Sequence, residues 1–134
     1  MVSATRDCHV LVIDDQTDSA DTLARLLRAH HFAASTCTYS KDCMSRVESS
    51  HPDVILLDLA MPGMDGFNIA DELRQNPDLR PKLLIAVTGL ADEDDKQRTR
   101  EAGFDFHLVK PVMWDQLEPL LVQATDERRG DLQH

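Results

Sequence analysis

Several short apolar runs of this sequence end in polar residues whose types are suited to chemistry on a charged substrate. Asp14 and Asp15 follow the first such run, and Asp58, Thr88 and Lys110 each end or follow a later one. Three carboxylates brought together would repel one another, so they would take up protons or recruit a cation. Because oxygen donors favour a hard ion over zinc, we expect Mg²⁺, with Mn²⁺ as the alternative.

The cationic Lys110 and the hydroxyl of Thr88 indicate that the same site also binds an anion. A lysine at a buried strand end, such as Lys110, is costly unless a carboxylate or a phosphoryl group lies nearby. Thr88 could donate its hydroxyl to the same anion, and Gly89 lets the backbone approach it closely. Each feature alone has an ordinary interpretation as a helix cap, a solvated lysine or a turn, whereas their combination favours a site.

The segments between these residues alternate between short apolar runs and amphipathic stretches. We predict strands at 8–13, 33–38, 53–57, 82–87 and 106–109, and helices at about 17–27, 41–49, 66–75, 91–102 and from 114 or 115 to 124. Five strands alternating with five helices predict an α/β fold, a doubly wound parallel sheet with helices on both faces. The carboxyl ends of such strands share one edge, where these folds place their sites.

Two helix boundaries are predicted from capping and from proline chemistry. Thr17 or Asp18 is expected to be the N-cap of the first helix, since both side chains accept hydrogen bonds from backbone N–H groups. Pro119 would disrupt the interior of the last helix, so we expect that helix to start at Asp115 or to kink.

Composition limits the class of protein. The chain has 134 residues and a net charge of −10, which suits a single domain over residues 1–134, with a core at about 8–125 and a polar tail at 126–134. The acidity disfavours nucleic acid as a partner. We recognise no membrane span or signal peptide and therefore expect a cytoplasmic protein. Cys8, Cys37 and Cys43 match no zinc pattern, and we expect free thiols.

The motifs resemble, in order and spacing, the receiver domain of two-component response regulators. The residues that carry this resemblance are Asp14-Asp15, the segment from Asp58 to Gly66, Thr88-Gly89 and Lys110-Pro111, within a match from about Cys8 to Thr125. The resemblance implies a flavodoxin-like (βα)5 sandwich with strand order 2-1-3-4-5. It also implies a cis peptide bond between Lys110 and Pro111.

The resemblance further implies roles for the site residues in a two-component phosphorelay. Asp58 would be the phosphoacceptor, taking a phosphoryl group from the phosphohistidine of a sensor histidine kinase or histidine phosphotransfer protein. Asp14, Asp15, Asp58 and the backbone carbonyl of Ala60 would hold Mg²⁺. Lys110 and Thr88 would contact the phosphoryl oxygens. The protein would be a switch that catalyses its own phosphorylation and autodephosphorylation, not a metabolic enzyme.

The output of such a switch would pass through protein contacts. His107 stands where similar proteins usually have Tyr or Phe, and we expect it to act with Thr88 in switching a surface formed by the fourth helix, fifth strand and fifth helix. A partly exposed strand-end histidine is the plainer interpretation.

Met1 and the polar tail favour a complete small protein over the receiver of a hybrid sensor histidine kinase. A phosphorylation-independent interaction module is a further alternative, whereas a haloacid-dehalogenase-like phosphatase would need an acid where Ala60 stands.

Overall fold

The apolar runs form a five-stranded parallel sheet in a computed structural model that describes residues 6–61, 65–89 and 93–133, without the side chains of residues 6, 7, 93–95 and 126–133. The strands are β1 (Arg6–Ile13), β2 (Phe32–Cys37), β3 (Val54–Asp58), β4 (Leu83–Thr88) and β5 (Phe106–Val109). Their order is β2-β1-β3-β4-β5, and every neighbouring pair is parallel. The predicted fold class and strand order are therefore confirmed.

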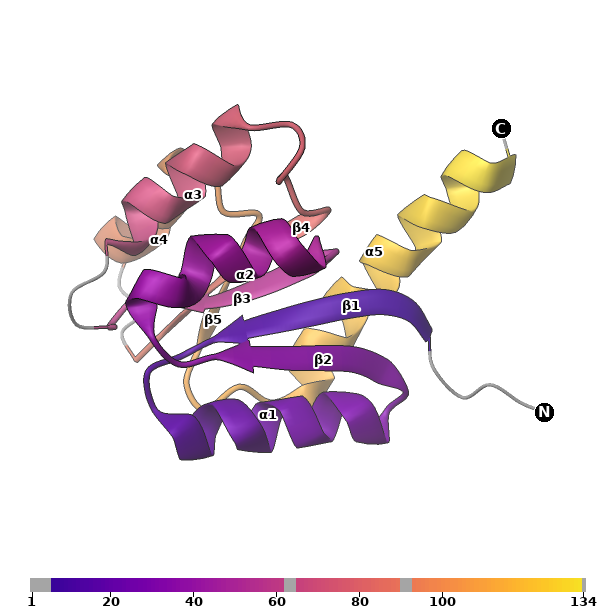
Figure 1. Cartoon of the computed structure of the whole chain (residues 1–134), viewed down its shortest axis with the longest axis horizontal. Helices are drawn as coiled ribbons and strands as arrows, with labels where there is room; N and C mark the ends of the chain where they lie inside the picture. The colour runs from indigo at the N-terminus through magenta and orange to yellow at the C-terminus, as the bar shows by residue number, and fades with distance from the viewer. Residues whose placement is uncertain (1–5, 62–64, 90–92, 134) are drawn as a thin grey trace.

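The helices lie in two layers, one on each face of the sheet (Figure 1). They are α1 (Thr17–Ala29), α2 (Cys43–Ser50), α3 (Gly66–Gln75), α4 (Glu93–Glu101) and α5 (Trp114–Gln133), with a short 3₁₀ helix η1 (Ser40–Asp42) before α2. Helices α1 and α5 cover one face, and α2, α3 and α4 lie on the other. The ends of the strands are therefore not covered by the two helix layers.

Strand β1 shows why the apolar runs are continuous. Successive side chains of a strand point to opposite faces, so both faces of a sheet covered by helices need apolar residues. Val10 and Val12 belong to the core under α1 and α5, whereas Leu11 and Ile13 belong to the core under α2 and α3. All four side chains are nearly inaccessible to solvent. Two cores thus hold the sheet rigidly between the layers.

Two boundary assignments, made from capping and from proline chemistry, differ from the structure by one or two residues. Helix α1 begins at Thr17 with Gln16 at the N-cap, so the assignment of that cap to Thr17 or Asp18 was wrong. Helix α5 begins at Trp114, one residue before Asp115, and Pro119 is its sixth residue. The carbonyl of Met113 accepts the N–H groups of residues 116 and 117, which sets this earlier start. The helix continues to Gln133, through most of the segment expected as a polar tail.

The three cysteines are free thiols, as predicted, and each is buried. Cys37 Sγ and Cys43 Sγ lie 3.9 Å apart in the core under α2. Burial, together with the adjacent Cys37 thiol, raises the pKa of Cys43 to about 12. Within the described ranges, each helix is too short or too polar to cross a membrane.

Burial of all three thiols predicts that they are unreactive in the folded protein. We expect Ellman's reagent at pH 8 to react with Cys8, Cys37 and Cys43 only as fast as the protein opens, because burial keeps the reagent away from all three sulfur atoms. At Cys43 burial also raises the pKa and so disfavours the thiolate, which is the reacting form. In denaturant all three should react rapidly. Absorbance at the released thionitrobenzoate band measures both rates. A thiol that reacts in the native protein as fast as in denaturant would contradict this packing.

Candidate functional site

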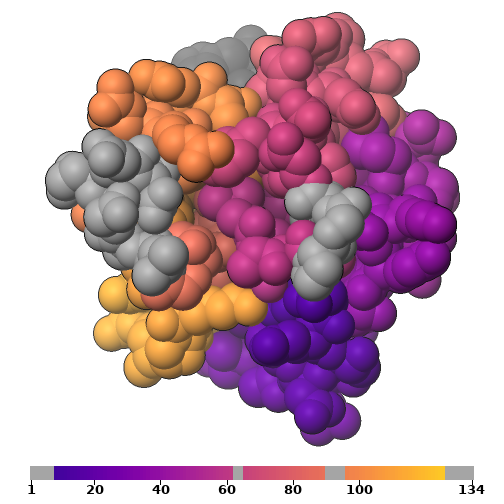
Figure 2. All heavy atoms as spheres, turned by 90° about the vertical axis from the view of Figure 1, so that its left-hand side faces the viewer, coloured from indigo at the N-terminus to yellow at the C-terminus, as the bar shows by residue number. Residues whose placement is uncertain are grey.

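The polar strand ends predicted from the sequence meet at one edge of the sheet. Strands β1 and β3 are neighbours, and Ile13 pairs with Leu57. The next residue of each, Asp14 and Asp58, therefore occupies an equivalent position along the chain. The strand order reverses between these two strands, which is where open parallel sheets leave a crevice for ligands. Figure 2 views this edge, where indigo, magenta and orange-to-yellow parts of the chain meet on one face.

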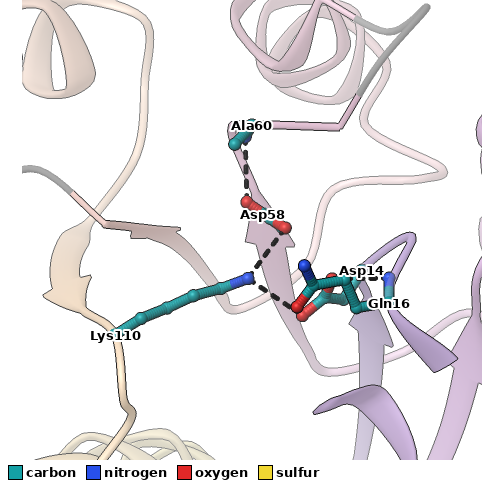
Figure 3. Close-up of polar contacts among 5 residues, drawn as sticks. All are labelled: Asp14, Gln16, Asp58, Ala60 and Lys110. Carbon is teal, nitrogen blue, oxygen red and sulfur yellow. Dashed lines mark hydrogen bonds and ion pairs between the residues drawn. The ribbon is translucent and has the colours of Figure 1, made fainter. Parts of the chain in front are cut away.

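Asp58 is almost fully buried at the end of β3, with 2% of its surface exposed. Its Oδ1 accepts a hydrogen bond from the backbone N–H of Ala60 at 2.9 Å. Its Oδ2 accepts one from Lys110 Nζ at 3.0 Å, and Figure 3 shows the lysine reaching the carboxylate across the edge. Both oxygens are therefore held in fixed positions by donors.

Asp14 is held in the same manner and is 5% exposed. Its Oδ1 accepts the backbone N–H of Gln16 at 3.0 Å, and its Oδ2 accepts Lys110 Nζ at 3.2 Å. One ammonium group thus contacts both buried carboxylates (Figure 3).

Three carboxylates at this edge fit a divalent cation. Asp14, Asp15 and Asp58 each offer one oxygen, and these oxygens lie within 4.8 Å of one another. Asp15 is exposed whereas the other two are buried, so an ion could enter from the solvent side. An all-oxygen donor set of this kind suits Mg²⁺ or Mn²⁺.

Lys110 is positioned by the strand next to its own. Its backbone N–H donates to the carbonyl of Thr88 at 2.8 Å, which ties the end of β5 to the end of β4. The peptide bond between Lys110 and Pro111 is cis, as the resemblance implied. Thr88 is the last residue of β4 and is half-buried, so it stands at the same edge as the carboxylates.

His107 lies away from this cluster, three residues before Lys110. It pairs in register with Ala86 and is half-buried. It lines a separate hollow of about 220 Å³ between α4 and β5, together with Lys96, Thr99 and Arg100. The structure therefore places His107 beside α4, in the lining of a different hollow from the one that Asp14, Asp58 and Lys110 line.

Comparisons with known proteins agree with this arrangement. A family model described as the response regulator receiver domain matches residues 10–121. The chain belongs to this receiver family. Residues 62–64 of the Asp58-to-Gly66 motif lie outside the described residues. The Asp58, Thr88 and Lys110 motifs of this receiver all fall within the matched range.

Its relatives include short and long proteins. An uncharacterized 14.6 kDa protein in the sodA1 3′ region of Leptolyngbya boryana is 35% identical over 77% of this chain and 79% of that protein. The sensor histidine kinase RcsC of Escherichia coli is 32% identical over 96% of this chain, which spans only 13% of RcsC. The solved receiver domain of a DNA binding response regulator (merR) from Colwellia psychrerythraea superposes with a TM-score of 0.83 at 29% identity, covering 90% of this chain and 99% of that one.

The pKa values of the two buried carboxyls of this receiver, Asp14 and Asp58, are shifted in opposite directions. Burial raises the pKa of Asp14, but hydrogen bonds from the Gln16 backbone and the Ser19 and Lys110 side chains outweigh it and leave that pKa below its usual range. Burial raises the pKa of Asp58 above its usual range, and Asp14 adds to the rise, while the Ala60 N–H and Lys110 oppose it without cancelling it. Two carboxylates sharing a site behave in this way because like charges cannot both ionise freely.

Lys110 remains charged despite its partial burial. Burial lowers the pKa of the ammonium group, but its hydrogen bonds to Asp58 and Asp14 outweigh burial and hold the pKa above its ordinary value. The lysine is therefore a permanent cation at neutral pH.

The backbone donors at this site were not identified from the sequence. The N–H groups of Gln16 and Ala60 each donate to the carboxylate two residues earlier, which is the geometry of an Asx turn. An Asp at a strand end followed by a tight turn is the available signal for such donors. The structure shows where the site residues lie, whereas the roles assigned to them remain predictions. These residues are Asp14, Asp15, Asp58, Ala60 with its backbone carbonyl, Thr88, His107 and Lys110.

The raised pKa of Asp58 predicts how stability depends on pH in divalent-free buffer. The carboxyl of the unfolded chain ionises at about pH 4, whereas that of the folded protein keeps its proton to higher pH. The free energy of unfolding therefore falls as pH rises from about 4 through the folded pKa. In the Asp58→Asn variant this side chain cannot ionise, so the accompanying fall in the free energy of unfolding does not occur. We expect its stability advantage over wild type to grow across that window and then level off, as measured by urea denaturation.

Asp71→Asn is the matched control, since Asp71 is exposed on α3. Its stability should follow the wild-type curve at every pH. An Asp58→Asn advantage that is the same at pH 4 and pH 7 would contradict the assigned direction of the Asp58 pKa.

Proposed function

We propose that this receiver accepts a phosphoryl group on Asp58 in a two-component phosphorelay. The observation that carries the proposal is the buried Asp58 carboxylate, whose two oxygens are held by the Ala60 N–H and by Lys110 Nζ. A fixed carboxylate beside a cation is suited to attack on phosphorus, because phosphoryl transfer depends on positioning and on stabilising negative charge.

The chain's own residues account for the transfer. A carboxylate oxygen of Asp58 attacks the phosphorus of a phosphohistidine, the P–O bond forms, the P–N bond breaks and the imidazole leaves. Lys110 already contacts Asp58 and stabilises the charge that gathers on the phosphoryl oxygens. Thr88, at the end of the next strand, donates its hydroxyl to one of these oxygens. The protein is a switch that catalyses its own phosphorylation and autodephosphorylation, not a metabolic enzyme.

A divalent ion, Mg²⁺ or alternatively Mn²⁺, would be held by Asp14, Asp15, Asp58 and the backbone carbonyl of Ala60. The close spacing of the three carboxylates supports this assignment. When bound, the ion supplies positive charge that offsets the repulsion between the carboxylates and an incoming phosphoryl group.

The partners we propose are proteins on both sides of the transfer. A sensor histidine kinase or a histidine phosphotransfer protein supplies the phosphoryl group, which agrees with the similarity to part of the sensor histidine kinase RcsC. Output passes to a protein target through α4, β5 and α5, with Thr88 and His107 as switch residues in a cytoplasmic setting. The alternatives are the receiver of a hybrid sensor histidine kinase and an interaction module that works without phosphorylation.

A direct test is incubation with Mg²⁺ and phosphoramidate, followed by intact mass spectrometry. We expect the wild type to gain the mass of one phosphoryl group, and Asp58→Asn to gain none. Lys110→Met should be phosphorylated at least about 10-fold more slowly, because it loses a charge-assisted contact to the reacting group.

The controls are Asp71→Asn and Lys41→Met, which remove the same charges from exposed positions on α3 and η1. Both should be phosphorylated at the wild-type rate. A wild-type protein without any gain in mass, or a gain that persists in Asp58→Asn, would refute the proposed function.

A further inference from the structure

A hollow of about 580 Å³ opens beside the acidic cluster, between α1 and the connection from β5 to α5. Its apolar lining comes from both sides of that gap and from the sheet below, namely Leu23, Leu26, Pro111, Val112, Val12 and Leu56. Leu23, Leu26 and Val112 are only half-buried, so part of this apolar surface remains open to solvent. The volume is within the range of about 300–1,000 Å³ typical of small-molecule sites.

The hollow is continuous with the reacting groups. Asp58 and Lys110 belong to its lining, together with the apolar residues. A molecule that delivers a group to Asp58 would therefore have its remaining atoms close to an apolar surface. Thr22, an exposed residue of α1, also lines the hollow and could control access to it.

We propose that this hollow is an acyl pocket, which makes acyl phosphates with apolar chains better phosphodonors than acetyl phosphate. This inference rests on the proposed function and deepens it by naming a substrate class. In the reaction an Asp58 oxygen attacks phosphorus, and the bond between phosphorus and the acyl oxygen breaks. The aspartyl phosphate forms and the carboxylate of the fatty acid leaves.

The size of the effect follows from the apolar area that the chain buries. The methyl of acetyl phosphate is too small to fill a space of this volume, whereas a hexanoyl chain adds four methylenes. Burial of about two of these should raise the second-order rate constant about 10-fold. Straight-chain acyl phosphates have leaving groups of nearly equal acidity, so intrinsic reactivity does not produce such a difference.

The experiment compares acetyl, butyryl and hexanoyl phosphate as donors to the full chain with Mg²⁺, with intact mass as the readout. We expect the second-order rate constant to rise from acetyl to hexanoyl phosphate by about 10-fold or more. Thr22→Phe should fill the hollow and abolish this rise, so that acetyl, butyryl and hexanoyl phosphate react at similar rates. Thr22→Ser is the matched control and should keep the preference.

A second readout does not depend on transfer to Asp58. Hexylphosphonate cannot transfer its phosphorus group, and we expect it to raise the melting temperature of the wild type at concentrations where methylphosphonate does not. Thr22→Phe should lose that response.

The outcomes separate this inference from the proposed function. If no donor, including phosphoramidate, adds a phosphoryl group, the proposed function fails and the inference fails with it. If acetyl phosphate reacts but the longer donors are no faster, the function stands and the acyl pocket is refuted, which would leave the hollow to a protein partner. A preference that persists unchanged in Thr22→Phe also refutes the pocket.

Discussion

One ammonium group between two buried carboxylates is the interaction on which the site depends. Asp14 and Asp58 come from neighbouring strands and are almost inaccessible to water, and Lys110 Nζ lies within 3.2 Å of an oxygen of each. In sequence the lysine is 96 residues from Asp14 and 52 from Asp58. The cluster therefore forms only when β1, β3 and β5 are all in place in the sheet.

The same interaction explains why the site is poised for a charged ligand. Burial penalises each carboxylate, and a single lysine cannot neutralise both, so Asp14 stays readily ionised while the pKa of Asp58 rises. Asp15 adds a third carboxylate at the solvent-exposed side. The remaining negative charge favours a cation, and a cation in turn makes the approach of a phosphoryl group favourable.

Much of the fold and of the candidate site could be predicted from the sequence, because the pattern of apolar residues matches the burial that the fold requires. Continuous runs such as Leu11–Ile13 need two covered faces, and their polar ends then must share an edge, which placed Asp14, Asp58 and Lys110 correctly. Helix boundaries that were predicted from a single residue were less accurate. The N-cap of α1 fell on Gln16, which has no strong capping preference, and α5 accommodated Pro119 in its second turn.

Features made by packing between distant elements could not be predicted. The hollow beside Asp58 is lined by Leu23 of α1 and by Val112 after β5, which are far apart in the sequence, so no local pattern predicts it. The second hollow, which His107 lines together with residues of α4, likewise has no local signal in the sequence.

The most direct measurement of the central interaction is a double-mutant cycle between Lys110 and Asp58, by urea denaturation at pH 7 without divalent ions. Lys110→Met should destabilise the wild type, because it leaves two buried carboxylates without their cation. In the Asp58→Asn background the same change should cost less, giving a coupling energy of about 1–3 kcal/mol. Effects that add to within about 0.3 kcal/mol would contradict the account, since Lys110 would then not stabilise Asp58.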